Sequence, residues 1–243
     1  MSYIADLHLD LPSHYGVDHA GQILDWLPSD SEKVFQQNIK DPQKKKYLES
    51  RGWHVPGCFK YKINQHGFRT DELRKNTHSV VALGCSFTVG IGLPIEDAWP
   101  SILSRKLNKT VYNLGVGGAS LDTVFRIADH WIPKIQPSAV ILLAPPIHRF
   151  EVYHNQKADV YTPTDNHRDL VKQWFSCDDN ALGNAKKNIL AIESISNSLD
   201  IPFFVFDSND IGSLSYARDF LHQGPDDHRE LAISMLDNGV SGV

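Results

Sequence analysis

The chain has 243 residues, of which 41% are hydrophobic and 22% charged, and a formal net charge of −5. This composition allows an ordinary hydrophobic core and excludes an intrinsically disordered chain. The acidic balance leaves no basic field of the kind that attracts nucleic acid, and no run of about 18 apolar residues predicts a membrane span. The length fits one domain with an appendage.

The first part of the chain, residues 1–75, is predicted to be an extension packed on a core domain of residues 76–243. Residues 29–49 predict a helix interrupted by Pro42, and residues 53–68 mix aromatic residues with Gly and Pro as strands or a folded loop would. Acidic and histidine side chains crowd near the start and suggest a metal site, but their irregular spacing matches no known ligand pattern. We therefore expect no metal at these residues, which are Asp6, His8, Asp10, His14, Asp18 and His19.

The chain begins with a short acidic stretch that lacks the apolar region of a signal peptide, so we expect a soluble, cytoplasmic protein. It has three cysteines, and an odd number at wide spacing argues against a disulfide framework. They are Cys58, Cys85 and Cys177.

A serine follows the first clear strand, residues 79–84, in the run Gly84-Cys85-Ser86-Phe87-Thr88. A serine in a glycine-flanked turn at a strand end is placed as a nucleophile would be, although a serine hydroxyl needs a neighbouring base to attack. The alternative is that Ser86 merely caps the following helix. The run is not the Gly-x-Ser-x-Gly elbow of α/β-hydrolases, because position 88 is threonine.

A helix is predicted next over residues 95–107, and a second strand, residues 111–115, then leads into a glycine-rich loop. Backbone N–H groups of such a loop suit a developing oxyanion. Two alternatives stay open. A dinucleotide loop is one, but its final glycine is replaced by Ser120; close packing of a helix against a strand is the other. Another amphipathic helix follows this loop.

The third strand, residues 139–144, runs into Pro145-Pro146-Ile147-His148-Arg149, and a long insertion at about 150–180 follows. An apolar stripe at residues 182, 185, 189, 192 and 199 predicts a helix before the last strand, residues 201–207. Continuous apolar strands that alternate with helices indicate a parallel sheet covered on both faces. In such sheets, ligands bind beyond the carboxyl ends of the strands.

Near the other end of the chain, Asp219 and His222 stand three residues apart in a loop that Gly224-Pro225 closes. A histidine that an acid orients is the usual base for a serine nucleophile. His228 is a rival base, and Asp226 and Asp227 are rival acids. We favour Asp219 and His222, and interpret His228 as a helix residue that supports the loop.

Together these segments resemble the SGNH (GDSL-type) hydrolase family. The first block of that family reads Gly-Asp-Ser-(Leu/Phe)-(Ser/Thr), and residues 84–88 fit it with cysteine in place of aspartate. Asn113, Gly115 and Gly118 match the second block, and Asp219 with His222 matches the final Asp-x-x-His. Two softer likenesses, residues 61–69 and 98–100, agree. The resemblance covers about residues 58–240.

The resemblance implies a flavodoxin-like three-layer α/β/α sandwich with a central parallel sheet, no cofactor and no metal. It implies that Ser86 attacks an ester, that His222 is the base and Asp219 orients it, and that the N–H groups of Ser86 and Gly118 bind the oxyanion. The asparagine of the family's third block is missing. His148 is a candidate replacement donor, and Arg149 is a candidate ligand for an anionic or polyol substrate, or else a surface residue paired with Glu151.

The predicted function is therefore a serine esterase that acts through an acyl-enzyme on a small-molecule or carbohydrate ester, such as an acetylated sugar. Two alternatives stay open: an acyltransferase that uses the same serine, and a catalytically silent binding or structural protein. No nucleic-acid partner is expected, and the sequence leaves the oligomeric state open.

Overall fold

The structure is a computed structural model, and it describes residues 14–154, 157–165 and 168–243. The six acidic and histidine residues near the start fall partly outside these ranges: Asp6, His8 and Asp10 are not described.

The strands are β1 (Ile23–Leu24), β2 (Tyr61–Lys62), β3 (Val80–Leu83), β4 (Val111–Asn113), β5 (Ala139–Ala144), β6 (Phe150–His154), β7 (Lys157–Tyr161) and β8 (Phe203–Asp207). The α-helices are α1 (Glu32–Asn38), α2 (Pro42–Ser50), α3 (Ser86–Val89), α4 (Trp99–Leu107), α5 (Leu121–Ile135), α6 (Asp169–Trp174), α7 (Asp178–Asn197) and α8 (Pro225–Asp237).

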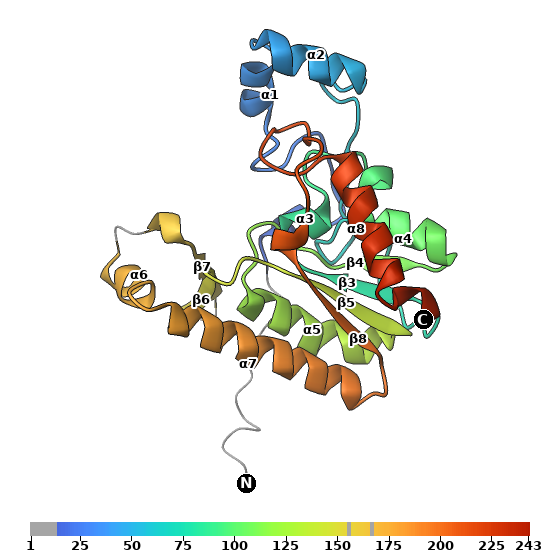
Figure 1. Cartoon of the computed structure of the whole chain (residues 1–243), viewed down its shortest axis with the longest axis vertical. Coiled ribbons are helices and arrows are strands. Elements are labelled where there is room, and N and C mark those ends of the chain that lie inside the picture. Colours follow the sequence, from blue (N-terminus) through green and yellow to red (C-terminus); the bar gives the residue numbers. More distant parts are fainter. Residues whose placement is uncertain (1–13, 155–156, 166–167) are drawn as a thin grey trace.

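A four-stranded sheet in the order β4-β3-β5-β8 forms the centre of the molecule, and all its neighbouring strands are parallel (Figure 1). All four are strands that the sequence predicts. Parallel neighbours need crossover connections, and the helices that supply them cover both faces of the sheet. The predicted α/β fold with a central parallel sheet is therefore confirmed.

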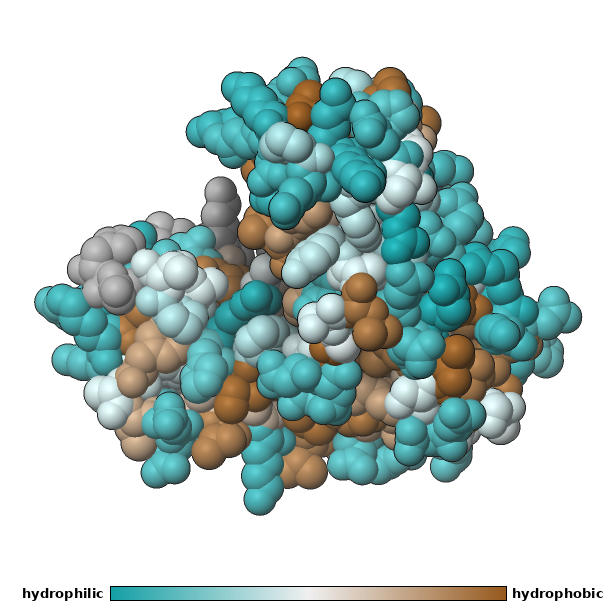
Figure 2. Space-filling view, turned by 45° about the horizontal axis from the view of Figure 1, so that its top comes forward, coloured by the Kyte–Doolittle hydropathy of each residue, from teal (hydrophilic) through white to brown (hydrophobic). Residues whose placement is uncertain are grey.

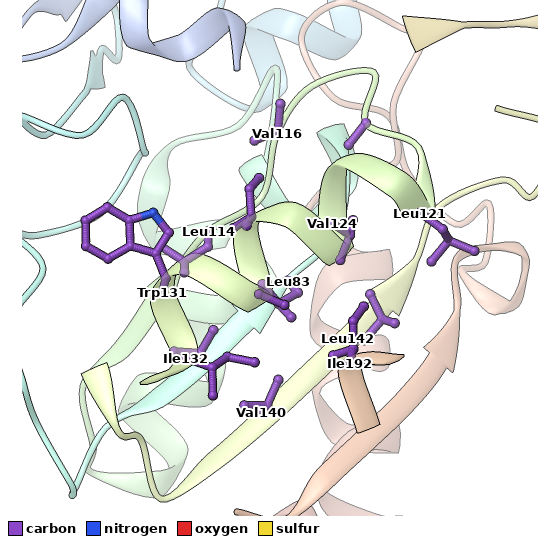
Figure 3. Close-up of a cluster of buried hydrophobic side chains, with 14 of the residues drawn as sticks. Leu83, Leu114, Val116, Leu121, Val124, Trp131, Ile132, Val140, Leu142 and Ile192 are labelled. Carbon is purple, nitrogen blue, oxygen red and sulfur yellow. The ribbon is translucent and has the colours of Figure 1, made fainter. Parts of the chain in front are cut away.

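Two hydrophobic clusters lie on the two faces of this sheet. One joins residues of β3 and β5 to α5 and α7, with Leu83, Val124, Leu142 and Ile192 among its members (Figure 3). The other joins the opposite side chains of the same strands to α4 and α8 through residues such as Trp99 and Met235. Because successive strand residues point to opposite faces, the apolar strands supply both clusters at once. The sheet and the helices packed on it therefore position the loops at the strand ends.

The predicted helices differ from the observed ones in detail. Residues 29–49 form two helices, because Asp41 caps the second and Pro42 occupies its first position, where a missing N–H costs nothing. The predicted helix at 95–107 is a 3₁₀ turn, Ile95–Asp97, followed by α4, which begins after the extended Ala98. Leu182 was predicted on the apolar face of α7 but is 55% exposed.

The insertion at 150–180 contains regular structure: β6 and β7 pair as an antiparallel hairpin, and α6 follows. Stacking of Phe150 against Trp174, with ring centroids 4.4 Å apart, joins the hairpin to α6. We call residues 150–174 the hairpin insertion. Figure 1 shows it as a projection beyond the sheet, separate from the one that carries α1 and α2.

Residues 14–75, called here the N-terminal extension, add α1, α2 and the short β1–β2 ribbon. They contact the region around residues 215–226 through several side chains, among them Asn38, Tyr47 and Arg51. The helices α1 and α2 form the top of the molecule in Figure 1, and Figure 2 shows mainly hydrophilic residues over that end. These contacts join the extension to the rest of the fold.

Candidate active site

The turn after β3, residues 84–92, is called here the serine turn. Gly84 has φ +153°, and a Cβ there would lie 2.3 Å from Thr88 Oγ1, so only glycine fits this position. Cys85 is the N-cap of α3, and Ser86 is the first residue of the helix. The Ser86 hydroxyl caps nothing and makes no hydrogen bond to another described residue, so the capping interpretation of this serine is wrong.

Arg69 holds the far side of the serine turn. Its buried guanidinium donates to three backbone carbonyls, of Val89, Gly90 and Leu93, at 2.7–3.2 Å. Burial lowers the pKa of Arg69 to about 10, which leaves it charged at neutral pH. The softer likeness at residues 61–69 therefore has a physical reason, because its last residue fastens the turn that carries Ser86.

Asn113, at the end of β4, joins the serine turn to the glycine-rich loop. Its amide donates to Thr88 O at 2.6 Å, and its side-chain oxygen accepts from Gly115 N at 3.0 Å. A Cβ on Gly115 would lie 2.7 Å from Val89 N, so this glycine serves close packing. Ser120 caps α5 with a capping box to Thr123, which is why it stands where a dinucleotide loop has glycine.

Gly118 differs from Gly115, because a Cβ there would meet no atom within 4 Å. Glycine is favoured at this position by its φ of +73°, which other residues rarely adopt, and the space around it is open. Within the described part of the chain, neither the Gly118 amide nor the Ser86 amide donates a hydrogen bond. Both N–H groups are thus available to a ligand.

Residues 217–224, called here the histidine loop, carry the acid and the base. Asp219 is buried and its Oδ2 lies 2.6 Å from His222 Nδ1. The other carboxylate oxygen accepts from the backbone N–H groups of Leu221 and His222 at 3.0 and 3.1 Å. The tight turn between them places Phe220 at φ +57°. These contacts fix the imidazole so that its other nitrogen points away from Asp219.

The histidine loop packs directly on the serine turn. Arg218 N donates to Gly92 O at 2.9 Å, and a Cβ on Gly92 would lie 2.8 Å from the Cβ of Ala217. The Phe87 ring meets the His222 ring edge-on, with centroids 5.5 Å apart. These contacts bring two segments that are far apart in the sequence to one edge of the sheet.

The N-terminal extension holds this loop from its other side. The Arg218 guanidinium forms a fully buried pair with Asp30, with Nη2 at 2.5 Å from Oδ2, and stacks on Trp26 and Phe59. Tyr61 also donates to Asp30, and burial raises the pKa of Tyr61 well above its usual value. The network ends at the serine turn, because Gly92 N donates to Tyr61 Oη at 2.8 Å. Sequence reasoning missed the pairing of Asp30 with Arg218, because these two residues lie far apart along the chain.

The rival acids and base have other partners. His228 is buried, and its Nδ1 accepts from Trp99 N at the start of α4. Burial lowers the pKa of His228 to about 4, so it is neutral at pH 7. Asp227 accepts from the backbone N–H groups of Leu214 and Ser215, and Asp226 pairs with Arg51 and Arg229. The His228 side chain thus bonds to the start of α4, and its support of the loop stays a prediction.

A pocket of about 360 Å³ is lined by several of the site residues that the sequence predicts. The residues that line it are Pro28, Ser29, Ser86, Ile91, Gly117, Gly118, Arg149 and His222. It brings Ser86, His222, Gly118 and Arg149 together, with Asp219 buried behind His222. No hydrogen bond joins Ser86 to His222 among the described residues. Such contacts are often long in a site without substrate. Sequence reasoning missed Pro28 and Ser29, which the N-terminal extension contributes.

His148 lies elsewhere. It is exposed, its ring lies 6.3 Å from that of Phe175, and it is not among the residues that line the pocket. This placement gives no support to the prediction that His148 donates to an oxyanion. Arg149 does line the pocket, and its Nη1 donates to Ala119 O at 3.3 Å. The alternative that pairs Arg149 with Glu151 is wrong, because Glu151 pairs with Arg126.

No group of three or more potential ligands could hold a metal ion among the described residues. Of the described helices, none is long and apolar enough to cross a membrane. The three cysteines are free thiols, and Cys85, beside the serine, is buried.

Neither a family model nor a curated protein matches this chain. Solved structures do, and they include proteins of the SGNH (GDSL-type) hydrolase family. A protein of the G-D-S-L family from Desulfitobacterium hafniense is 20% identical, with 67% of this chain and 73% of that chain covered and a TM-score of 0.37. The SGNH-hydrolase family esterase AlinE4 is 17% identical, with 67% and 74% covered and a TM-score of 0.38.

A third is the esterase EstA of Pseudoalteromonas sp., which is 16% identical, with 66% of this chain and 95% of that chain covered and a TM-score of 0.38. At such identities and TM-scores the likenesses carry no conclusion about activity. A functional assignment therefore rests on this chain's own residues.

Proposed function

We propose that this protein is a serine hydrolase that cleaves small carboxylic esters through an acyl-enzyme. One observation carries the proposal: one pocket holds Ser86, whose hydroxyl bonds to no described residue, and His222, whose Nδ1 lies 2.6 Å from the buried Asp219 carboxylate. A nucleophile, a base and an orienting acid are the parts that this chemistry needs.

In the first half-reaction, Ser86 Oγ attacks the ester carbonyl carbon, and His222 Nε2 takes the hydroxyl proton. Asp219 accepts the Nδ1–H of His222, which keeps Nε2 free as the base and stabilises the imidazolium that forms. The new C–O bond gives a tetrahedral intermediate. When it collapses, the bond to the alcohol breaks and His222 returns the proton to the leaving oxygen.

The negative charge of that intermediate needs hydrogen-bond donors in place beforehand. Ser86 and Gly118 line the pocket, and their amides donate to no acceptor among the described residues, so we assign the oxyanion to them. Without the third-block asparagine, turnover is expected to be slower, since loss of one donor typically costs about 10²–10³ in kcat.

In the second half-reaction, a water molecule in the pocket gives a proton to His222 and attacks the acyl carbon. Collapse of the second intermediate breaks the bond to Ser86 Oγ, which takes the proton back from His222. The products are the free acid and the restored enzyme. An alcohol in place of the water would give a transfer reaction by the same steps.

The test compares Ser86→Ala with wild type on a panel of para-nitrophenyl acyl esters and with a fluorophosphonate probe. Removal of a triad nucleophile typically costs on the order of 10⁶ in rate, so the variant should lose both turnover and labelling. Ser29→Ala is the matched control, because Ser29 lines the same pocket without an oriented histidine, and it should still be labelled. Equal labelling of Ser86→Ala and wild type would refute the assignment.

Two further measurements separate the alternatives. Product analysis with added alcohols distinguishes hydrolysis from transfer, since a transferase forms the new ester in competition with the acid. A folded wild-type protein that neither turns over any ester nor reacts with the probe would indicate a binding protein instead.

A further inference from the structure

The described lining of the pocket includes one permanently charged side chain. Of the described residues that line it, only Arg149 carries a fixed charge, and none is acidic. A buried or half-buried cation normally has a carboxylate nearby, because removal from water costs free energy that a partner must offset. The lack of one on this surface needs an explanation.

The guanidinium of Arg149 keeps most of its hydrogen-bonding capacity. It has five N–H donors, and the structure shows a single side-chain hydrogen bond, to Ala119 O at 3.3 Å. Among the described residues it forms no ion pair. The nearest acid in the sequence, Glu151, is unavailable, because it is fully buried against Arg126 Nε and Nη2 at 2.7 and 2.6 Å.

The backbone that carries Arg149 is held firmly. Arg149 N donates to Pro146 O, and Glu151 N donates to Asp122 Oδ2 at 3.0 Å. Between them, the Phe150 ring is buried in the stack with Trp174. A fixed backbone lowers the entropy lost when the side chain binds a ligand.

The electrostatic surroundings favour an anion. The glycine-rich loop leads into the N-terminus of the 15-residue helix α5, which carries a partial positive charge. The one acid of its first turn, Asp122, accepts hydrogen bonds from Asn184, Asn188 and Glu151 N. Both of its carboxylate oxygens therefore already have hydrogen-bond donors from α7 and from the hairpin insertion.

We propose that Arg149 selects esters that carry an anionic group, a carboxylate or a phosphate, beside the bond to be cleaved. The inference rests on the proposed function and adds the substrate class to it. Arginine suits this role, because its planar fork binds the oxygens of either group in pairs. A pocket of about 360 Å³ is near the lower end of ligand-pocket sizes, so the anionic ester is small.

The test uses pairs of esters that differ only in charge. On the acyl side, mono-para-nitrophenyl succinate is compared with its methyl ester. On the alcohol side, para-acetoxybenzoate is compared with its methyl ester, and para-acetoxyphenyl phosphate distinguishes phosphate from carboxylate. A hydrogen bond to a charged group contributes about 1.5–3 kcal/mol, so kcat/KM for the preferred anionic ester should exceed that of its neutral partner by about 10- to 100-fold.

Arg149→Met should abolish that ratio, and Arg149→Lys should retain a part of it, since lysine keeps the charge without the fork. Arg74→Met is the matched control, because it removes the same charge from an exposed position outside the pocket. Its ratio should equal that of wild type. If wild type shows no preference, or Arg149→Met lowers both esters equally, the proposal is wrong; the second result would instead give Arg149 a role at the oxyanion.

A binding measurement keeps this inference separate from catalysis. In Ser86→Ala, calorimetry should show tighter binding of the intact anionic ester than of its methyl ester, and Arg149→Met in the same background should remove the difference. If no ester is turned over but this difference is present, the hydrolase proposal fails and the anion site stands. Equal binding of both esters would overturn the anion site, whatever the catalytic result.

Discussion

The N-terminal extension lines the pocket with Pro28 and Ser29, whereas the hairpin insertion begins just after the pocket residue Arg149. Each is attached by a fully buried arginine–carboxylate pair. In the extension, Asp30 pairs with Arg218 of the histidine loop. In the insertion, Glu151 pairs with Arg126 of α5. The neighbours of these pairs differ: Arg218 precedes the candidate acid Asp219, whereas Glu151 follows Arg149 by two residues.

This difference indicates a division of labour. The extension holds the acid and base in place, because Asn38 also donates to the carbonyls of Arg218 and Asp219 at 3.3 Å. The insertion is fastened at Glu151, two residues after the pocket's cation Arg149. Damage to the extension should therefore affect the chemical step, and damage to the insertion should affect the choice of substrate.

The largest effect is expected from Arg218→Met. It leaves Asp30 as a buried charge with Tyr61 as its one side-chain donor among the described residues, and it removes the stacking on Trp26 and Phe59. Breaking a buried pair costs about 3–5 kcal/mol, and we expect the upper part of that range in denaturant unfolding. In the protein that remains folded, kcat for a neutral ester should fall as well.

The control for this change is Arg51→Met, which breaks the half-exposed link between the extension and Asp226. Pairs of that kind contribute about 0–1 kcal/mol, so both stability and kcat should change little. An Arg218→Met protein with wild-type kcat would show that the extension is not needed to hold the histidine loop.

A smaller effect, about 3 kcal/mol, is expected from Arg126→Met, because Glu151 keeps hydrogen bonds from the hydroxyls of Thr123 and Tyr153. The kcat for a neutral ester should stay close to that of wild type, while the preference for an anionic ester falls as Arg149 loses its support. Steady-state kinetics on one charged and neutral pair measures both. A fall in kcat like that of Arg218→Met would contradict the division of labour.

The smallest effect concerns pH. Burial lowers the pKa of His14, in the extension, to about 4 from 6.5. Below pH 6.5 the unfolded chain binds a proton that the folded one does not, so stability is full above that pH and falls as pH drops towards 4. At pH 5 the loss is about 1–2 kcal/mol.

This loss should loosen the extension more than the hairpin insertion. Amide hydrogen exchange, corrected for intrinsic rates, should be faster at pH 5 than at pH 7 in residues 14–75, and this increase should be larger than in the hairpin insertion. His14→Phe keeps a ring against Phe68 but cannot titrate, so the increase in exchange rate from pH 7 to pH 5 should be smaller in this variant. An equal increase in exchange rate in the extension and the insertion would refute the prediction, and so would the same increase in His14→Phe and wild type.

Much of the fold could be predicted because its signals are local. The four sheet strands are short apolar runs, and burial on both faces of a parallel sheet requires that composition. The failures come from packing. Leu182 has the spacing of a core residue, yet its side chain is exposed. It lies in the N-terminal part of α7, and that end of the helix extends past the sheet towards the hairpin insertion (Figure 1).

The same division holds for the candidate site. The sequence predicts Ser86, Asp219 and His222 as candidates, because each stands in a short block whose residue types and spacing are visible locally. Arg149 and His148 are adjacent, and only the start of the hairpin at Phe150 decides that Arg149 lines the pocket while His148 is exposed. No periodicity in the sequence predicts that these two adjacent side chains differ in this way.

The sequence by itself determined the parallel sheet, the glycine-bounded serine turn and the acid three residues before the base, because each depends on contacts within a few residues or on a strand's own composition. Only the tertiary structure decided that Arg69, Asp30 and Arg218 hold the site together. Their partners are carbonyls and carboxylates from distant segments, and buried polar groups find such partners only when the chain is folded around them.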